Sequence, residues 1–262
     1  MPITLDFSGR VALVTGAARG IGQKTAEAFA EAGARLVLAD ISDDIEQTAA
    51  ALREGGAEAV ACTVDVSDAA SCEAMVKVAM DNFGRLDYAF NNAGIGSHEV
   101  PVGDLEESAW RRMLDINLTG VFLGLKYQVP AMLQNGGGVI VNNSSVLGTR
   151  ALPRCSLEYT AAKHGVIGLT RQLAVNHGHE GIRCLAVCPG LVDTPLVAVD
   201  AEAGLAKGGV NDQMRDWFME RIPAKRFANA EDIAGAVVMM CDERASYVNG
   251  SHLLIDGGLV QG

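Results

Sequence analysis

Short runs of apolar residues alternate along the chain with longer stretches in which apolar residues recur every three or four positions. The short runs predict strands and the longer stretches predict helices. The strands are expected near residues 11–15, 35–39, 58–63, 86–91, 139–143, 183–188 and 252–255. The helices are expected near residues 20–32, 43–54, 68–83, 105–134, 157–178 and 230–242. Strands that are apolar throughout are typical of a parallel sheet with helices on both faces, so the pattern predicts an α/β fold with a doubly wound, Rossmann-type sheet of about seven strands.

One segment, near residues 191–229, lacks this rhythm and follows the sixth predicted strand. We interpret it as an insertion within a single domain that spans residues 1–262. The insertion carries apolar residues such as Leu196, Val197 and Phe218. Ligands of open α/β sheets lie beyond the carboxyl ends of the strands, so the segment predicts a substrate lid, with ordinary surface helices as the alternative.

Composition narrows the function classes. The chain has 262 residues, of which 49% are hydrophobic and 20% charged, as expected of a globular protein. A net charge of -11 argues against binding to nucleic acid or to an anionic membrane. The amino-terminal residues do not resemble a signal peptide, which favours a cytoplasmic location. The six cysteines form no Cys-x-x-Cys pair, so we expect free thiols and no metal site.

A glycine-rich turn follows the first predicted strand at residues 15–22 and leads into a helix. Gly16 permits a tight turn, whereas Gly20 and Gly22 remove side chains where a pyrophosphate and the neighbouring strand would approach. The amides at the helix start favour negative charge. The turn therefore predicts a nucleotide site, although a simple strand–helix turn has the same residues.

Asp40 ends the second predicted strand and indicates which nucleotide would bind. A carboxylate at this place can accept hydrogen bonds from the adenosine ribose hydroxyls, and it repels a 2′-phosphate. Two unit charges about 4 Å apart interact by about 4 kcal/mol at an effective dielectric constant near 20. Only Arg19 is near enough in sequence to compensate, so we expect NAD as the cofactor rather than NADP.

Two further strand ends carry candidate cofactor contacts. Asp65, followed by Val66, could accept a hydrogen bond from adenine, or it could cap the next helix. The run 91–94, which includes Asn92, Ala93 and Gly94, has small residues that would let the backbone approach the ribose and a flat ring. A plain turn is the alternative for this run.

Tyr159 and Lys163 are four residues apart in a predicted helix, so their side chains share one face. The ammonium group of Lys163 could lower the pKa of the phenol from its usual value near 10, which would make a phenolate available near neutral pH. The pair follows Ser145 at the end of the fifth predicted strand.

Taken together, these motifs resemble the short-chain dehydrogenase/reductase family. The resemblance rests on the turn at 15–22, the Asn-Asn-Ala-Gly run at 91–94, Asn117, Ser145, the Tyr-x-x-x-Lys pair and the Pro-Gly pair at 189–190, and it covers nearly the whole chain. Two departures stand out. Asn143 replaces a residue that is often apolar in the family, and the spacing between Ser145 and Tyr159 is one residue longer than usual, which leaves Ser144 as an alternative to Ser145.

The resemblance implies a catalytic tetrad that transfers a hydride between a nicotinamide and an alcohol or carbonyl. Tyr159 would exchange the proton of the substrate hydroxyl, Ser145 would hydrogen-bond the substrate oxygen, Lys163 would hold the nicotinamide ribose, and Asn117 would anchor a relay water. It also implies contacts of the Ile21 amide with the pyrophosphate. The residues that would border the nicotinamide carboxamide are Pro189, Gly190, Val192 and Thr194.

The substrate is expected to be a medium-sized hydrophobic or cyclic secondary alcohol or ketone, because the insertion is largely apolar. Arg150 and Arg154 could instead meet an anionic substrate. The alternatives are a 3-oxoacyl thioester reductase of the same family, a dehydratase or epimerase, and a non-catalytic nucleotide-sensing protein. The resemblance further implies a homotetramer.

Overall fold

The computed structural model describes residues 4–194, 199–200, 205–206 and 212–260. The strands in these segments are β1 (Val11–Thr15), β2 (Arg35–Asp40), β3 (Ala59–Thr63), β4 (Tyr88–Asn91), β5 (Gly138–Asn143), β6 (Ile182–Pro189), β7 (Val199–Asp200), β8 (Leu205–Ala206) and β9 (His252–Ile255). The helices are α1 (Gly20–Glu31), α2 (Ile45–Glu54), α3 (Ala69–Phe83), α4 (Glu107–Leu114), α5 (Gly120–Leu133), α6 (Leu157–His177), α7 (Asp212–Arg221) and α8 (Ala230–Cys241).

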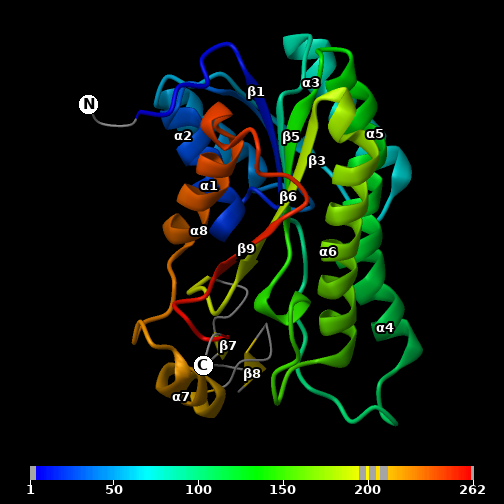
Figure 1. Cartoon of the computed structure of the whole chain (residues 1–262), viewed down its shortest axis with the longest axis vertical. Helices are drawn as coiled ribbons and strands as arrows, with labels where there is room; N and C mark the ends of the chain where they lie inside the picture. The colour runs from blue at the N-terminus through cyan, green and yellow to red at the C-terminus, as the bar shows by residue number, and fades with distance from the viewer. Residues whose placement is uncertain (1–3, 195–198, 201–204, 207–211, 261–262) are drawn as a thin grey trace.

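The main sheet has seven strands in the order β3-β2-β1-β4-β5-β6-β9, and every neighbouring pair is parallel. The expected doubly wound Rossmann-type sheet is therefore confirmed. The chain runs outward from β1 to β3 and then returns to β4 on the other side of β1 (Figure 1). This reversal of strand order creates a switch point between β1 and β4, where ligands of such sheets bind.

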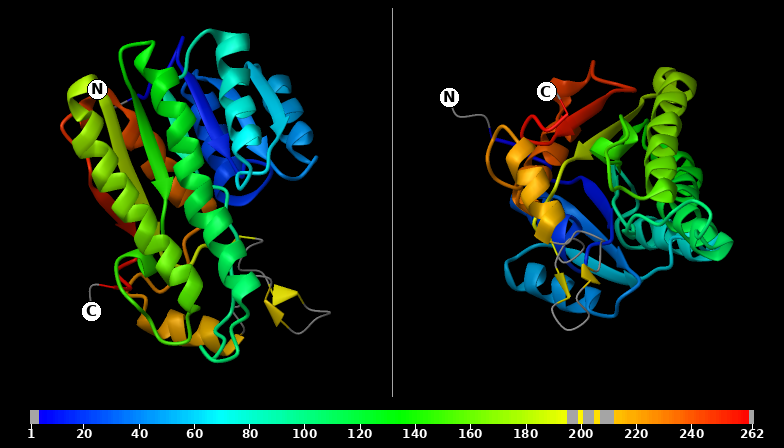
Figure 2. Two further views of the ribbon diagram at one scale, coloured as in Figure 1. Left: turned by 90° about the vertical axis from the view of Figure 1, so that its right-hand side faces the viewer. Right: turned by 90° about the horizontal axis from the view of Figure 1, so that it is seen from below.

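Helices cover both faces of the sheet. One face carries α1, α2 and α8, and the other carries α3, α5 and α6 (Figures 1 and 2). Each face has its own apolar core, with Phe29 and Ile233 prominent in one and Met75 and Val166 in the other. Because both faces are covered, all the side chains of β1 are buried, which explains why this strand is apolar up to its last residue, Thr15.

The helix expected over residues 105–134 is divided. Between α4 and α5 the chain forms a π-helical turn, Asp115–Thr119, which holds Asn117. Such turns arise where one residue is accommodated beyond the regular helical repeat, and they are common at functional sites. Hydrophobic periodicity does not reveal this turn, because the apolar pattern continues on both sides of it.

The insertion lies at the carboxyl end of the sheet, where Figure 1 shows α7 and the antiparallel pair β7 and β8. Parts of it, including Leu196 and Val197, fall outside the described residues. Phe218 of α7 and Ile222, which directly follows this helix, join a third apolar cluster with Val146, Leu259 and Val260.

In the part of the chain that the structure describes, no helix is long and apolar enough to cross a membrane.

Candidate active site

The glycine-rich turn joins β1 to α1 at the switch point, and the packing leaves no room for a side chain at Gly16 or Gly22. Gly16 has a φ of +65°, and a Cβ atom on it would lie 2.9 Å from the Cα atom of Ala93. A Cβ atom on Gly22 would overlap the carbonyl group of Gly16. No side chain among the described residues caps the start of α1, whose residue before the first turn is Arg19. The first amides of α1, including that of Ile21, are thus available to an anion, which fits a dinucleotide pyrophosphate.

Asp40 lies beside this turn, at the end of β2. Its Oδ2 atom accepts a hydrogen bond of 3.0 Å from the amide of Ala18, and its Oδ1 atom accepts one of 3.0 Å from the amide of Ser42. Within the described segments, no ion pair joins Arg19 to Asp40. The carboxylate is therefore fixed at the rim of the turn with its negative charge uncompensated by this arginine.

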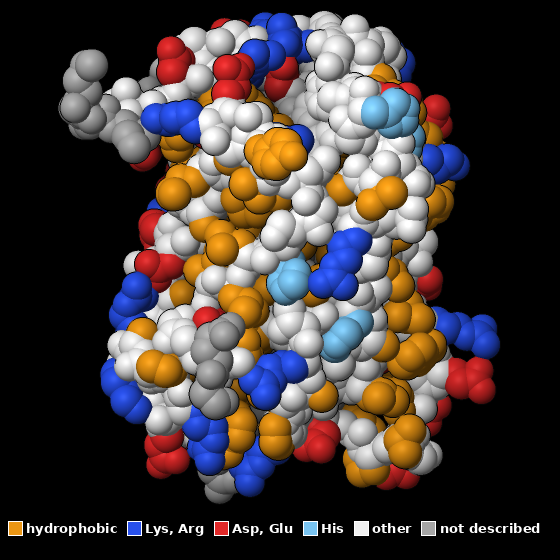
Figure 3. Space-filling view, viewed as in Figure 1, with side chains coloured by type: hydrophobic (Ala, Val, Ile, Leu, Met, Phe, Trp, Pro, Cys, Tyr) orange, Lys and Arg blue, Asp and Glu red, His pale blue; other side chains and the backbone are white. Residues whose placement is uncertain are grey.

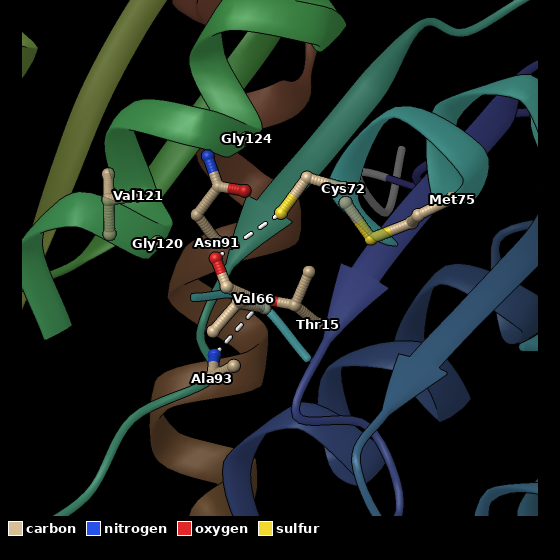
Figure 4. Close-up of a pocket in the computed structure, with 9 residues that line it drawn as sticks. All are labelled: Thr15, Val66, Cys72, Met75, Asn91, Ala93, Gly120, Val121 and Gly124. Atoms are coloured by element: carbon tan, nitrogen blue, oxygen red, sulfur yellow. Dashed lines mark hydrogen bonds between the residues drawn. The ribbon is translucent and has the colours of Figure 1, made fainter. Parts of the chain in front are cut away.

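Asp65 and Val66 follow β3. Asp65 is exposed, and its Oδ1 atom accepts hydrogen bonds from the amide and hydroxyl of Ser67. The start of α3 is capped instead by Asp68, so Asp65 does not serve as the helix cap. Val66 lines a small cavity of about 10 Å³ together with residues of β1, β4 and α5 (Figure 4).

The Asn-Asn-Ala-Gly run closes the other side of the switch point. The Nδ2 atom of Asn92 donates to the carbonyls of Thr15 at 2.9 Å and Gly16 at 3.2 Å. The hydroxyl of Thr15 also accepts the amide of Ala93 at 3.0 Å, as Figure 4 shows. A Cβ atom on Gly94 would collide with the Oδ1 atom of Asn117. These contacts bind the run tightly to the glycine turn.

Asn117 is 1% exposed, and its side chain is fully engaged by the loop after β4. Its Nδ2 atom donates to the carbonyl of Ile95 at 3.0 Å, and its Oδ1 atom accepts the amide of Ile95 at 3.1 Å. The Nδ2 atom also donates to the Sδ atom of Met113, so both side-chain donors of Asn117 are occupied within the chain.

Ser145, Tyr159 and Lys163 meet beyond β5. Ser145 begins a 3₁₀ turn, and its Oγ atom accepts the amide of Leu147 at 3.1 Å. The ammonium group of Lys163 lies 5.4 Å from the centre of the Tyr159 ring and donates to the carbonyl of Asn143 at 2.7 Å. The neighbouring Ser144 is turned away, because its hydroxyl donates to the carbonyl of Lys163 at 2.8 Å. The geometry therefore favours Ser145 over Ser144.

The electrostatics of this pair differ from the sequence-based expectation of a phenol with a lowered pKa. Burial raises the pKa of Tyr159 to about 12, although a hydrogen bond with Ser145 opposes the rise. Burial also lowers the pKa of Lys163 to about 8. Burial removes both groups from water, which disfavours the phenolate of Tyr159 and the ammonium of Lys163. The ammonium contacts the face of the Tyr159 ring and the carbonyl of Asn143. The spacing of the two residues did not reveal this desolvation.

The residues after β6 form the remaining wall. Pro189 is the last residue of β6, and the amide of Gly190 donates to the carbonyl of Ile255 at 2.9 Å. Val192 is buried and forms an isolated bridge with Ala228. Thr194 is the last described residue before the gap in the insertion, and its hydroxyl donates to the carbonyl of Val192 at 3.5 Å.

Comparison with known proteins agrees with this architecture. The sequence model of a family described as enoyl-(acyl carrier protein) reductase matches residues 16–260. The chain is 42% identical over 252 residues to cis-4-hydroxycyclohexanecarboxylate dehydrogenase of Sinomonas cyclohexanicum, covering 96% of this chain and 97% of that protein. It is 40% identical over 260 residues to levodione reductase of Leifsonia aquatica, covering 97% and 96%.

This chain belongs to the short-chain dehydrogenase/reductase family. A crystal structure of levodione reductase superposes with a TM-score of 0.89 at 39% identity, covering 96% of this chain and 98% of that one. The family resemblance inferred from the motifs is confirmed, and the chain is an oxidoreductase by these similarities.

Within this short-chain dehydrogenase, Arg150 has a structural contact. Its Nη1 atom donates to the carbonyl of Val260 at 2.5 Å, which ties the 3₁₀ turn after Ser145 to the carboxyl-terminal segment of the third apolar cluster. Arg154 is exposed and has a φ of +63°. The structure thus gives Arg150 a partner within the chain.

One buried acid next to Tyr159 was not among the residues expected from the sequence. Glu158 is 2% exposed, and its Oε1 atom accepts a short hydrogen bond of 2.5 Å from the hydroxyl of Ser97. The contact joins the start of α6 to the loop after β4. Nothing in the sequence links these two residues, because they are far apart and neither belongs to a periodic pattern.

Proposed function

We propose that this chain is an NAD-dependent dehydrogenase and ketone reductase that acts on medium-sized, neutral, cyclic or hydrophobic secondary alcohols. The observation that carries the proposal is the meeting of Ser145, Tyr159 and Lys163 at the carboxyl edge of the sheet, beside a turn from which side chains are excluded.

The residues present fit a nicotinamide dinucleotide. The glycine turn and the uncapped start of α1 would receive the pyrophosphate, with Gly20 and Ile21 supplying amides. Asp65 and Val66 would lie towards the adenine, and the strand ends after β4 and β6 would border the ribose and the carboxamide. When bound, the nicotinamide supplies the hydride acceptor in oxidation and the hydride donor in reduction.

The chain's own residues would move the proton and hold the substrate. Ser145 would donate a hydrogen bond to the substrate oxygen, and Tyr159 would take the hydroxyl proton in oxidation or return it in reduction. Lys163 would favour the phenolate by its charge and hold the ribose. Asn117 would bind a relay water through its main chain.

Asp40 supports NAD rather than NADP. Its carboxylate is held at the rim of the glycine turn, where it can accept hydrogen bonds from ribose hydroxyls and repels a 2′-phosphate by about 4 kcal/mol at about 4 Å. Asp40→Ala should reduce the ratio of kcat/KM for NAD to that for NADP by at least about tenfold. Asp44→Ala, which removes a nearby exposed charge, is the control and should change the ratio little. An unchanged ratio in Asp40→Ala would contradict the assignment.

The substrate class rests on two observations. The two relatives named above are a hydroxycyclohexanecarboxylate dehydrogenase and a levodione reductase, as their names state. In this chain, the third apolar cluster lies at the catalytic end of the sheet, and Arg150 is bound to the carboxyl-terminal segment. The first of these names is that of a carboxylate, so the relatives support a ring-shaped substrate but not its neutrality. The apolar cluster and the internal partner of Arg150 are what favour a neutral ring.

The decisive experiment measures NADH formation with a panel of linear, cyclic, aromatic, steroid and hydroxy-acid alcohols, together with reduction of an acetoacetyl thioester. Turnover of cyclic neutral alcohols is expected. Tyr159→Phe should lower kcat at least about a thousandfold while NADH binding persists, because the proton acceptor is lost. Tyr247→Phe alters a fully exposed phenol and serves as the control. Retained turnover in Tyr159→Phe would refute the mechanism, and thioester reduction alone would favour the other family activity.

A further inference from the structure

Asn143, the last residue of β5, is polar at a position that is often apolar in the family. Its Nδ2 atom donates to the Oδ1 atom of Asn92 at 2.9 Å. Its own Oδ1 atom is buried and has no hydrogen-bond partner among the described residues. A buried acceptor without a partner destabilises a fold, and an apolar side chain would avoid that loss. The presence of asparagine therefore calls for a reason other than stability.

The partner of Asn143 leads to the glycine turn. The Oδ1 atom of Asn92 accepts the side-chain amide of Asn143, and its Nδ2 atom donates to the carbonyls of Thr15 and Gly16. Asn92 can make all three bonds only in one orientation of its amide, because the donor and acceptor ends differ. The side chain of Asn143 holds the acceptor end of Asn92 in the orientation that the bonds to Thr15 and Gly16 require.

The main chain of Asn143 leads to the catalytic lysine. Its carbonyl accepts the ammonium group of Lys163 at 2.7 Å, and the following residue, Ser144, bonds the lysine carbonyl at 2.8 Å. Asn143 is thus linked through Asn92 to the turn that would receive the pyrophosphate, and directly to the ammonium that would hold the ribose. The glycine turn, Asn92 and Asn143 lie at the ends of three different strands, β1, β4 and β5.

We propose that Asn143 is a positioning residue whose side-chain amide sets the placement of the glycine turn relative to Lys163 across the cofactor cleft. This inference rests on the proposed function, since it takes the cleft to hold a nicotinamide dinucleotide. Local features that lower stability are expected where function requires them, and the unpartnered Oδ1 atom is such a feature.

Asn143→Val separates this role from a structural one. The variant removes the bond to Asn92 together with the unpartnered acceptor, so its Tm without cofactor should equal or exceed that of the wild type. Its dissociation constant for NADH, measured by fluorescence titration, should rise about five- to tenfold, because Asn92 and the turn lose their fixed orientation. A merely structural residue would show a lower Tm and an unchanged dissociation constant, and that result would overturn the proposal.

Asn249→Leu is the matched control. Asn249 also bonds main-chain groups of a neighbouring segment, accepting the amide of Cys184 at 2.8 Å and donating to the carbonyl of Ile182 at 3.2 Å, but at the opposite end of β6 from the site. Its loss should lower the Tm and leave NADH binding unchanged. The opposite responses of the two variants would support a positioning role for Asn143.

A double-mutant cycle with Asn92→Ala tests whether the two asparagines act through one another. If they do, adding Asn143→Val to Asn92→Ala should weaken NADH binding by less than about twofold. If the factors by which the two single substitutions raise the dissociation constant instead multiply in the double variant, the proposal is overturned. Failure of the wild type to bind NADH would refute the proposed function and this inference with it, whereas equal binding by wild type and Asn143→Val would refute this inference alone.

Discussion

At the scale of single residues, the proposed proton chemistry would depend on Tyr159 and Lys163 as a coupled pair. The pKa of the phenol is raised to about 12 and that of the ammonium is lowered to about 8, both by burial. Oxidation needs the phenolate together with the ammonium, a state that holds one proton between the two groups. Below about pH 8 both groups are protonated, and between about pH 8 and pH 12 one proton is retained.

This titration predicts the pH dependence of alcohol oxidation. The kcat/KM should rise about tenfold per pH unit below about pH 8, because one proton must leave the pair, and should then level off. Ketone reduction should show the reverse, with a plateau below about pH 8. The measurement is kcat/KM as a function of pH for oxidation and for reduction. Lys163→Met should abolish the change of slope near pH 8. A wild-type oxidation rate independent of pH from 6 to 8 would contradict the prediction.

Most of the candidate site could be predicted from short motifs, because the chemistry requires particular side chains at fixed spacings. Tyr159 and Lys163 meet as their helical spacing predicts. The raised phenol pKa could not be predicted, because desolvation depends on every element packed around the ring. The hydrogen bond between Asn143 and Asn92 could not be predicted either, because it joins residues from two different strand ends. The polar Asn143 at the end of an apolar strand could, however, have indicated a special role.

At the scale of elements, Asp87 joins β1 to β4 at the end of the sheet opposite the site. Its carboxylate accepts the amide of Val11 at 2.9 Å and bonds the guanidinium groups of Arg10 and Arg85. Burial alone would raise the pKa of Asp87, but the bonds from Arg85, Val11 and Arg10 outweigh it and hold the pKa below its ordinary value. The stabilisation is therefore present above about pH 4 and is lost as the pH falls through the lowered pKa.

Asp87→Asn should lower the free energy of unfolding by about 2 kcal/mol at pH 7, a value below that of fully buried pairs because both arginines are partly exposed. Urea unfolding should show the difference from wild type shrinking as the pH approaches 3. Asp81→Asn breaks an exposed ion pair with Lys77 and should cost less than about 0.5 kcal/mol. If the difference in the free energy of unfolding between wild type and Asp87→Asn grew as the pH fell, the lowered pKa of Asp87 would be contradicted.

The elements themselves followed from sequence wherever they were long and periodic. The seven strands of the sheet and the helices between them appear within a few residues of the expected bounds. The π-helical turn at Asn117 did not follow, because it changes hydrogen bonding without changing the apolar pattern. The insertion gave no periodic signal, and the contacts of Phe218 with the carboxyl-terminal residues depend on segments distant in sequence.

At the scale of the whole molecule, Arg150 joins the segment after Ser145 to the carboxyl-terminal segment. Arg150→Met removes its bond to the carbonyl of Val260 while keeping an apolar stem. We expect the KM for neutral cyclic alcohols to rise a few-fold with kcat nearly unchanged, because a positioning contact is lost. The ratio of kcat/KM for neutral substrates to that for carboxylate substrates should not change. A selective loss of activity on carboxylate substrates would instead assign Arg150 to substrate binding.

The outer face of α6 predicts assembly of several copies. Its side chains include Leu157 and Val175, which are 50% and 77% exposed and lie five helical turns apart on one face. Phe122 of α5 is also 47% exposed. Hydrophobic side chains line the edge formed by these helices in Figure 3. Such exposed apolar surface favours burial against another copy, as in the homotetramer that the family resemblance implies.

Sedimentation equilibrium should therefore give a mass of about four times the 27.4 kDa of one chain. Val175→Glu would place a charge in this contact, where it would be buried without a partner, so the variant should dissociate to smaller species. Val102→Glu changes an equally exposed apolar residue in a loop and should leave the mass unaltered. Because the contact packs the long helices and not the strand ends, the dissociated variant should still bind NADH. A wild-type mass of 27.4 kDa would refute the assembly.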